Sequence, residues 1–595
     1  MSYIIIKENN VIKCNDLIKA ADSADDILFL ADDIIMHDDN AFAVMSSCLH
    51  AADKHAIVCG FEIENNKSLI ETALKYLPEY STVSEVNACC ALIKRSVIDK
   101  LGYLDESFEN LQEALLDYYR HINRFGFSSV VSYRALFSYD KKAKTDSNQD
   151  ALQRPVFQDL HPCVSFLKVL DENYYPKKRI LFDCAIMPSM YCGTSEYQKA
   201  IFESFYRLFK DKYEIYIYVG REAAEYHKLS ETYDNIIYPD TINETTGAFH
   251  IGFAPNQLMH VEHQLLMSMR CLKIVHTMHD IMMVRINEHI GVGDRADVEL
   301  GIRLSDGIVC ISNYTKDDFL ARYYYVDGIN EKRIPVIYNS TAITPPENEH
   351  ELPFDEYFLI PGNSYKHKAI KEAIKAVSGS AHNFIVIGID DNEFIEPNIY
   401  SYKSGQLDSD FMNYLYANCK AIVIPSLYEG FGLPLIIGFK FGKRVIVNNN
   451  PLNKELREHF KQFEDYVCFF DRFEEITEII NTIDFNIDLN KSEYNDTWDR
   501  VAMEYECLFD DMLKDDVDIK RLTERWQLYN VLDEKIKSFR KIAENDKNTI
   551  GSLNEELKHM YSQFGDYGLF HLIRLAFKKN IRFKHPKLFK FLGGK

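Results

Sequence analysis

The 595-residue chain lacks the sequence features of several protein classes. No stretch approaches the roughly 18 uninterrupted apolar residues of a membrane-spanning helix, and the first residues lack the charged-then-apolar pattern of a secretory signal. The 13 cysteines are scattered and include no C-x-x-C pair. These absences predict a protein that is neither membrane-spanning nor secreted, with reduced and mostly buried thiols in the cytosol.

The chain is long, rich in apolar residues and acidic. Its length predicts three or four domains, and 46% hydrophobic with 13% aromatic residues indicates well-filled globular cores. A formal net charge of −22 argues against nucleic acid as the main partner. The charge is unevenly placed, because residues 569–595 hold eight Lys or Arg and no Asp or Glu. This basic segment points to an anionic partner surface.

A heptad pattern precedes the basic segment. Apolar positions from Leu532 to Phe564 alternate spacings of four and three, and Asp546 is the one charged position among them. The pattern predicts a coiled coil at 520–565 that forms a homo-oligomer through 532–564. A helix packed on its own chain is the alternative.

The end of the chain, 566–595, interleaves large apolar side chains with cations. This composition predicts a basic amphipathic tail that attaches to an anionic membrane surface through 569–595. The alternative is a basic helix lying on the acidic body of the same protein. With the tail on a membrane, we expect a cytoplasmic protein that is peripheral on the inner face of the cell membrane.

The alternation of apolar strands with helical stretches predicts an α/β protein. A polar segment begins near Tyr139, an apolar strand starts at Arg179, and a Pro-rich junction follows Thr344. The stretch Trp498–Tyr505 predicts a further helix. These signals divide the chain into a first unit at 1–140, a linker at 141–177, a second unit at 178–345, a third unit at 346–515 that includes the further helix, and the C-terminal coiled coil and tail.

The most informative stretch is Pro425–Pro434, which reads Pro-Ser-Leu-Tyr-Glu-Gly-Phe-Gly-Leu-Pro. It follows the apolar run Ala421–Ile424 and precedes a helical stretch and a second β-branched strand, which predicts a βαβ unit. In open α/β sheets, ligands bind beyond the carboxyl ends of strands, where a turn leads into a helix. Gly430 and Gly432 allow the backbone to approach such a ligand, and Glu429 can accept hydrogen bonds from sugar hydroxyls.

This motif resembles the signature of the retaining, two-Rossmann-domain (GT-B) glycosyltransferases of family 4, which is a Glu, seven residues and a second Glu. Ile437 stands at the second position, and Asn448, Asn449 and Asn450 are candidates for a replacement contact. The resemblance covers roughly residues 180–510 and implies two Rossmann-like domains, with a terminal helix that packs back on the first of them. It also implies sugar transfer from a nucleotide-sugar with retention of anomeric configuration, and neither a metal nor another cofactor.

The resemblance further implies a set of site residues in the second and third units. Lys368, which follows the strand Tyr357–Pro361, is implied to stabilise the departing phosphate, and Glu429 is implied to fix the sugar. His279, in a His-Asp pair after a strand, is implied to line the cleft between the two domains and to be the third catalytic residue. The donor-binding residues implied in the same way are Gly193, Thr194, Asp280, Lys366, His367, Gly430, Phe431, Gly432 and Leu433. Ser312 is predicted to be a helix cap and not a catalyst.

The first unit resembles the later half of the family 2 (GT-A) glycosyltransferases. Asp26–Ile35 predicts a buried strand that ends in the carboxylates Asp32 and Asp33, and the chain is expected to begin just before this strand. The first metal ligand of that family is replaced by Ala31, and Ala114 stands where part of the base motif is expected. A truncated unit with a structural or acceptor-binding role is predicted, with an independent second transferase as the alternative.

These patterns together predict a hexosyltransferase-type enzyme. It is expected to move a sugar from a nucleotide-sugar to a glycan or lipid-linked acceptor in the synthesis of a bacterial surface polysaccharide, such as O-antigen or capsule. Two alternatives stay open: a non-catalytic scaffold built from degenerate glycosyltransferase domains, and a two-site polymerase in which the first unit is also active. Glu429 and Lys368 favour catalysis, whereas Ile437, Ala31 and Ala114 favour the scaffold.

Overall fold

The computed structural model divides the chain into two compact units, residues 1–526 and 527–595. The residues whose structure is described are 2–83, 89–139, 161–190, 192–242, 246–257, 261–285, 295–326, 328–389, 392–403, 406–485, 494, 496–522, 524, 525, 538, 541, 542 and 544. The heptad segment 532–564 and the tail 566–595 lie outside the described residues, except for residues 538, 541, 542 and 544. Within this set, no helix has the length and apolar character needed to cross a membrane.

Residues 2–139 fold into a mixed α/β unit, whose sheet we call the first sheet. Its elements are β1 (Tyr3–Ile6), α1 (Val11–Ala20), β2 (Asp26–Leu30), β3 (Ile34–Met36), α2 (Ala41–His50), β4 (His55–Glu62), α3 (Lys67–Tyr76), β5 (Tyr80–Val83), β6 (Cys90–Ile93), α4 (Arg95–Leu101), α5 (Leu111–Arg124) and β7 (Ser128–Tyr139). The described strands follow the order β1-β2-β6-β4-β7-β3, and β5 also pairs with β7. β1 runs parallel to β2, whereas β6 is antiparallel to both β2 and β4. The expectation that the chain begins just before the Asp-pair strand is wrong, because β1 and α1 precede β2.

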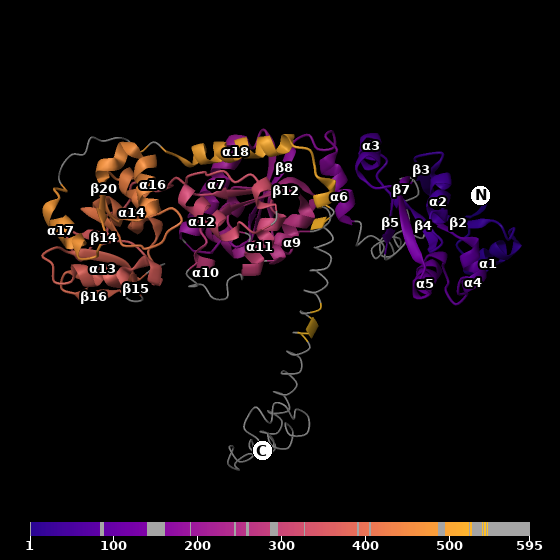
Figure 1. The fold of residues 1–595 in the computed structure, drawn as a ribbon, viewed down its shortest axis with the longest axis horizontal. Coiled ribbons are helices and arrows are strands. Elements are labelled where there is room, and N and C mark those ends of the chain that lie inside the picture. The colour runs from indigo at the N-terminus through magenta and orange to yellow at the C-terminus, as the bar shows by residue number, and fades with distance from the viewer. Residues whose placement is uncertain are drawn as a thin grey trace, which may run out of the picture. The chain divides into compact units, whose positions relative to one another are not determined.

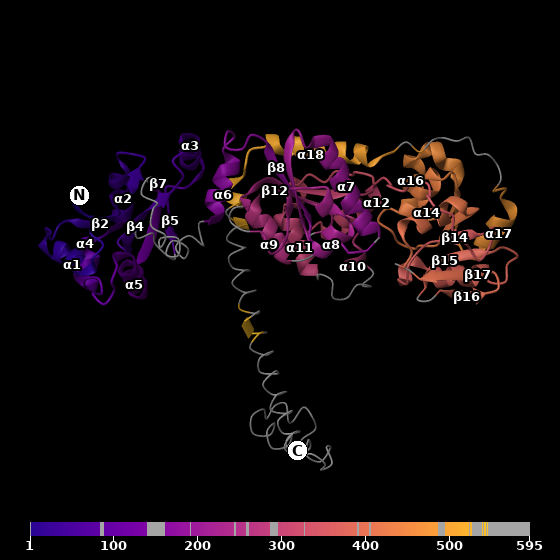
Figure 2. The same cartoon turned by 180° about the vertical axis from the view of Figure 1, so that it is seen from behind.

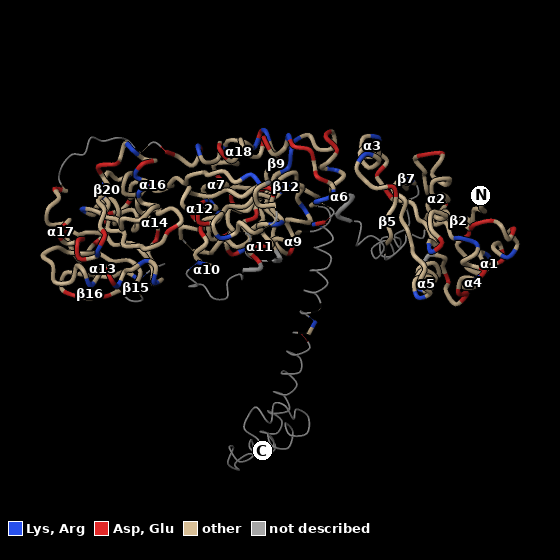
Figure 3. Tube along the Cα trace, viewed as in Figure 1, with Lys and Arg blue, Asp and Glu red and all other residues tan. Residues whose placement is uncertain are grey.

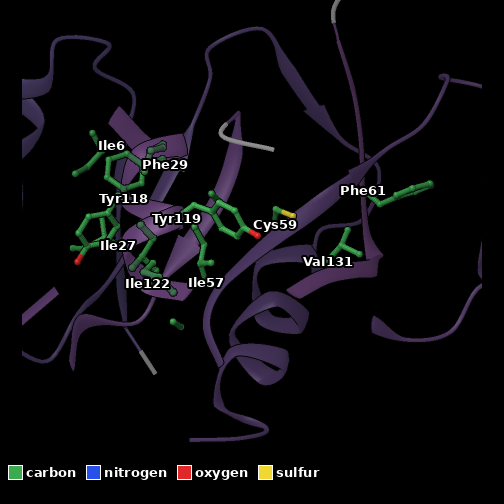
Figure 4. Packing of buried hydrophobic residues seen from close by; sticks show 14 of the residues in the cluster. Ile6, Ile27, Phe29, Ile57, Cys59, Phe61, Tyr118, Tyr119, Ile122 and Val131 are labelled. Atoms are coloured by element: carbon green, nitrogen blue, oxygen red, sulfur yellow. The ribbon is translucent and has the colours of Figure 1, made fainter. Parts of the chain in front are cut away.

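The core of this unit is built by α5 against the sheet. Asn110 caps α5 by accepting a hydrogen bond from the backbone N–H of Glu113 at 2.9 Å. Tyr118 and Ile122, spaced one turn apart, then face the sheet with Tyr119 and pack against apolar side chains such as Phe29 (Figure 4). The apolar stripe of α5 therefore sets which face of the helix is buried.

A second sheet occupies residues 178–310. The elements of this region are α6 (His161–Leu170), β8 (Lys178–Cys184), α7 (Gly193–Phe209), β9 (Tyr213–Val219), α8 (Arg221–Tyr226), β10 (Ile236–Ile237), β11 (Phe249–Ala254), α9 (Val261–Arg270), β12 (Cys271–Met278), α10 (Met282–Arg285), α11 (Arg295–Leu304), β13 (Gly307–Cys310) and α12 (Asn313–Tyr323). The described strands are all parallel, in the order β10-β9-β8-β11-β12-β13. This is the 3-2-1-4-5-6 order of a doubly wound Rossmann sheet.

A third sheet, residues 358–470, repeats that order. Its elements are β14 (Phe358–Ile360), α13 (Ile370–Val377), β15 (Phe384–Ile389), β16 (Glu393–Glu396), β17 (Ile399–Lys403), α14 (Ser409–Asn418), β18 (Ala421–Ile424), α15 (Leu433–Lys440), β19 (Arg444–Asn448), α16 (Pro451–His459), β20 (Val467–Phe470) and α17 (Glu475–Thr482). Strands β17-β15-β14-β18-β19-β20 are parallel, and β16 adds an antiparallel edge. The predicted mixed α/β fold with parallel sheets is confirmed.

Two helices lie outside these sheets, one predicted from the sequence and one not. The helix predicted from Trp498 is confirmed as α18 (Trp498–Lys514), which buries Tyr505 and Phe509 against α7 and the second sheet (Figures 1 and 2). This helix carries more acidic than basic residues along its length (Figure 3). The segment 141–177, predicted as a linker, contains the helix α6. The apolar side chains Phe166 and Leu167 of this helix are fully buried.

Candidate functional site

The site lies where β14 and β18, neighbouring parallel strands of the third sheet, both end. The strand order reverses between these two strands, so their loops open a crevice at the carboxyl edge of the sheet. Lys368 comes from the 3₁₀ helix Lys366–Lys368 after β14, and Glu429 comes from the loop after β18. The Lys368 Nζ lies 2.5 Å from Glu429 Oε1, and the two side chains are only 20% and 17% exposed. The structure thus pairs two of the three residues predicted to be catalytic.

The backbone holds these two loops together. The N–H of Leu427 donates to the carbonyl oxygen of His367 at 2.8 Å, which ties the β18 loop to the β14 loop. Directly after Lys368, Ala369 has a φ of 49°, a left-handed conformation that is uncommon for a residue with a Cβ. Such conformations cost roughly 1–3 kcal/mol and gather at functional sites. The position of Lys368 is therefore imposed by a strained turn as well as by its ion pair.

A cavity of about 180 Å³ adjoins the ion pair. Both Lys368 and Glu429 contribute to its wall, which includes polar groups next to the strand ends and apolar groups from β15 and α14. The remaining lining residues are Pro361, Gly362, Asn363, Ile387, Met412, Tyr416, Ile424, Ser426 and Pro434. An apolar wall with a few polar groups at one end is the usual character of a small-molecule site.

Two glycines of the Pro425–Pro434 motif have conformational reasons to be glycine. Gly432 is the N-cap of α15 with a φ of 83°, which a residue with a side chain rarely adopts. At Gly430, a Cβ would lie 1.9 Å from the carbonyl oxygen of His279, so no side chain fits there. Gly430 therefore marks the closest approach of the third-sheet loop to the loop after β12.

That loop carries the predicted His-Asp pair. The His279 Nε2 lies 3.3 Å from the carbonyl oxygen of Pro255, and its ring meets the Tyr197 ring edge-on at 4.6 Å. Burial lowers the pKa of His279 to about 4, so its imidazole is neutral at pH 7. Because a carbonyl only accepts, the Nε2 holds the proton and the Nδ1 is left as the acceptor.

Asp280 interacts electrostatically with Lys368 and Glu429. Its Oδ1 accepts from the N–H of Met282 at 2.8 Å. Burial, together with the nearby Glu429 carboxylate, raises the pKa of Asp280, while Lys368 and His367 act in the opposite direction. These four groups are thus close enough to sense one another, and the site contains two carboxylates beside one lysine.

The other predicted donor-binding residues fall into separate environments. Gly193 begins α7 beside Leu433, since a Cβ on Gly193 would lie 3.7 Å from the Leu433 Cδ1. Thr194 and Lys366 are exposed, whereas His367 is buried. The Phe431 side chain is 3% exposed and packs in the core of the third sheet, so only its backbone is available to a ligand.

Ser312 is confirmed as a helix cap. Its hydroxyl oxygen accepts from the N–H of Thr315 at 3.0 Å at the start of α12. The same hydroxyl donates to the carbonyl oxygen of Gly430 at 2.8 Å. The cap therefore also joins the second sheet to the loop of the third.

Ile437 lies on α15 and is 7% exposed within the core of the third sheet. Two of the three candidate substitutes are engaged elsewhere. The Asn449 amide donates to Asp471 Oδ1 at 2.8 Å, and the Asn450 side chain caps α16 by accepting from the N–H of Asn453. No replacement for the second carboxylate of the signature is evident among these two side chains.

The Asp pair of the first unit has a different setting. Asp32 is 76% exposed at its side chain and forms an ion pair with Lys7 at 3.4 Å. Asp33 is partly exposed beside it. Across the described parts of the chain, no cluster of three or more His, Cys, Asp and Glu side chains is arranged to hold a metal.

Several residues of the cavity were not predicted from the sequence. Asn363 and Ser426 line it, and each stands close after a strand that the sequence identified, so their position at strand ends was an available signal. Met412 and Tyr416 reach the cavity from one face of α14, four residues apart. No motif marks them, because their proximity arises from the packing of α14 on the sheet.

Comparisons with known proteins bear on this part of the chain. Residues 347–484, which include Lys368 and Glu429, match the model of the family described as Glycosyl transferases group 1. Over 173 residues the chain is 27% identical to the O-antigen chain mannosyltransferase RfbU of Salmonella typhimurium, covering 27% of this chain and 46% of the relative. The chain therefore spans about half the length of the curated relative that it matches.

Two solved structures align with the chain at low similarity. Sucrose-phosphate synthase from Thermosynechococcus elongatus aligns with a TM-score of 0.40 and 15% identity, over 60% of this chain and 100% of that one. Anabaena HepE, solved in complex with UDP and glucose, aligns with a TM-score of 0.39 and 16% identity, over 60% of this chain and 100% of that one. At TM-scores this low, the likeness assigns no activity to the chain.

Proposed function

We propose that residues 178–515 form a retaining GT-B glycosyltransferase of family 4, which moves a sugar from a nucleotide-sugar to a glycan or lipid-linked acceptor. The observation that carries this proposal is the pairing of Lys368 with Glu429 at the switch point of a doubly wound sheet, 2.5 Å apart. Both residues stand within the range that matches the group 1 glycosyltransferases. A cation and a carboxylate beside a cavity are the groups that a diphosphate and a sugar require.

Each group has a distinct role in the transfer. The bond between the anomeric carbon and the donor phosphate oxygen breaks, and a bond from that carbon to the acceptor oxygen forms. The Lys368 ammonium neutralises charge that develops on the departing phosphate, and Glu429 with the backbone amides at the start of α15 fixes the sugar. The acceptor proton passes to the departing phosphate oxygen, so the protein needs no separate base and no metal.

We propose that the loop after β12, in the second sheet, faces the donor across the site. Because its pKa lies at about 4, His279 is neutral at working pH and offers its Nδ1 as a hydrogen-bond acceptor. Asp280 and Glu429 together give the crevice a negative side, which suits the hydroxyls of a sugar and leaves Lys368 to face the phosphates. Gly193, at the start of α7, lies beside Leu433 at the start of α15.

Ile437 removes a carboxylate that the family directs at the ribose. Loss of one charge-assisted hydrogen bond weakens donor binding by about 1.5–3 kcal/mol, which lowers affinity without excluding activity. Asn363, Ser426 and Tyr416 line the cavity on the same sheet edge, and we propose that they hold the nucleoside instead. In this proposal, the three side chains take the place of the missing carboxylate, so the site functions with an apolar residue at position 437.

The proposals for the acceptor and the cellular setting rest on a relative and on the C-terminal sequence. The relative named as an O-antigen chain mannosyltransferase supports an acceptor from bacterial surface polysaccharide synthesis. We further propose that the enzyme is cytoplasmic and peripheral on the inner membrane face, attached through 569–595, and that it forms a homo-oligomer through 532–564. The positive charge of 569–595 supports the membrane attachment. The heptad pattern of 532–564 supports the homo-oligomer.

A thermal-shift panel of UDP-, GDP-, dTDP- and CMP-sugars tests the proposal. A ligand that binds the native state alone stabilises it by about 2.7 kcal/mol at a hundredfold excess over its Kd. We expect one nucleotide class to raise the Tm of the wild type, with the shift lost in Lys368→Ala and reduced in Glu429→Gln. Lys371→Ala is the control, because Lys371 is exposed on α13 three residues away. No shift with any donor at millimolar concentration would favour the scaffold.

A further inference from the structure

The hydroxyl of Tyr428 lies at the junction of two loops that carry the proposed site. It donates to the Oδ2 of Asp318 at 3.0 Å and accepts from the N–H of Ile281 at 3.3 Å. Tyr428 directly precedes Glu429, while Ile281 directly follows Asp280. One side chain of the third-sheet loop therefore contacts both the backbone of the His-Asp loop and the helix α12.

The partner of Tyr428 is itself held in place. Asp318 forms an ion pair with Arg285 from α10, and the Asp318 side chain is 16% exposed. The Arg285 guanidinium also lies over the Tyr428 ring, 5.3 Å from its centroid. Burial, and the nearby Asp280 and Asp318 carboxylates, raise the pKa of Tyr428, so the hydroxyl keeps its proton and remains a donor to Asp318.

A second set of contacts holds the other flank of Glu429. The carbonyl oxygen of Gly430 accepts from the hydroxyls of Ser312 at 2.8 Å and Thr315 at 3.0 Å. The Thr315 hydroxyl also lies 3.3 Å from the carbonyl oxygen of His279. Both chain neighbours of Glu429 are therefore hydrogen-bonded to the second-sheet side of the crevice. Tyr428 is bonded through its side-chain hydroxyl and Gly430 through its backbone carbonyl oxygen.

We infer that Tyr428 is a positioning residue, whose hydroxyl sets the placement of Glu429 against His279 and Asp280. The inference rests on the proposed function, because it concerns how that site is assembled. Tyr428 itself is 7% exposed and is absent from the lining of the cavity. It acts through Glu429, and loss of its hydroxyl should affect the alignment of the transfer more than the affinity for the nucleotide.

Steady-state kinetics of the full chain test the functional part of this inference. Tyr428→Phe removes only the hydroxyl, and we expect kcat to fall about tenfold while the donor KM and the nucleotide-induced Tm shift stay within about twofold. Asp318→Asn should give a similar split, and the double variant should lose little more than either single one. Tyr324→Phe is the control, since Tyr324 is the C-cap residue directly after α12 and is 74% exposed. A wild-type kcat in both single variants overturns the inference. A loss of nucleotide binding as large as the loss of kcat also overturns it.

Hydrogen exchange separates this outcome from a failure of the proposed function. In Tyr428→Phe the N–H of Ile281 loses its partner, so the peptide spanning 279–285 should exchange at least about threefold faster than in the wild type and in Tyr324→Phe. Unchanged exchange in that peptide overturns the inference whether or not the enzyme transfers sugar. Faster exchange in a chain that binds no nucleotide-sugar would retain the contact and refute the proposed function instead.

Discussion

In the described parts of the chain, two ion pairs each join a lysine and a carboxylate at the carboxyl ends of neighbouring parallel strands. In the first sheet, Lys7 follows β1 and pairs with Asp32 after β2 at 3.4 Å, with side chains 53% and 76% exposed. In the third sheet, Lys368 follows β14 and pairs with Glu429 after β18 at 2.5 Å, with side chains 20% and 17% exposed. The two pairs share residue types and strand geometry and differ in their surroundings.

The surroundings explain why one pair borders a cavity. β6 runs antiparallel beside β2 and begins at this edge of the first sheet, where the N–H of Ala31 donates to the carbonyl oxygen of Cys89 at 2.8 Å. In the third sheet β15 is parallel to β14 and contributes Ile387, while α14 contributes Tyr416. Partial burial makes the Lys368–Glu429 pair costly to break, whereas a water-exposed pair contributes about 0–1 kcal/mol. Paired charges at strand ends are therefore not sufficient for a site.

The largest expected effect comes from the close approach of the two loops beside the third-sheet pair. Gly430→Ala should lower the transfer rate about 100-fold or more, because its Cβ would lie 1.9 Å from the carbonyl oxygen of His279 and the loop must move. Gly220→Ala is the matched control, since nothing lies within 4 Å of its Cβ and its φ is −64°. Equal activity of the two variants in a transfer assay would contradict the close contact.

A smaller effect should distinguish the two ion pairs by stability. Lys368→Ala leaves Glu429 partly buried beside Asp280 without its cation, and we expect a loss of about 1–3 kcal/mol in the free energy of unfolding. Lys7→Ala should cost less than about 1 kcal/mol. The measurement is the denaturation midpoint in urea, followed for each sheet by hydrogen exchange, with Lys371→Ala as the control. Similar losses for both lysines would remove the distinction.

The smallest effect is expected from the carboxylates of the first unit. The double variant Asp32→Ala, Asp33→Ala should keep transfer activity within about twofold, because Asp32 is exposed and paired only with a surface lysine among the contacts described here. Activity is measured with the donor that the thermal-shift panel identifies. A large loss would instead favour a two-site polymerase, in which the first unit catalyses its own transfer.

Local signals predicted much of the candidate site. The strands before them located the loops of Glu429 and Lys368, and the resemblance to the family motif singled out these two residues. Ser312 and Trp498 were identified by helix-capping and helical patterns. The sequence missed the contact of Tyr428 with Asp318, because these residues are 110 positions apart and no local pattern relates them. It also suggested a ligand-facing role for Phe431, whose ring lies in the core because the turn before α15 directs it inward.

The sequence alone determined the alternation of strands and helices, the glycine-rich turn and the charged residues at strand ends. These features depend on hydrophobic period and backbone sterics, which act over a few neighbouring residues. Only the tertiary structure decided which charged pair is withdrawn from water and which loops meet at Gly430. Burial and loop contacts depend on the strand order and on the layers that cover each sheet edge, and these arise from residues far apart in the chain.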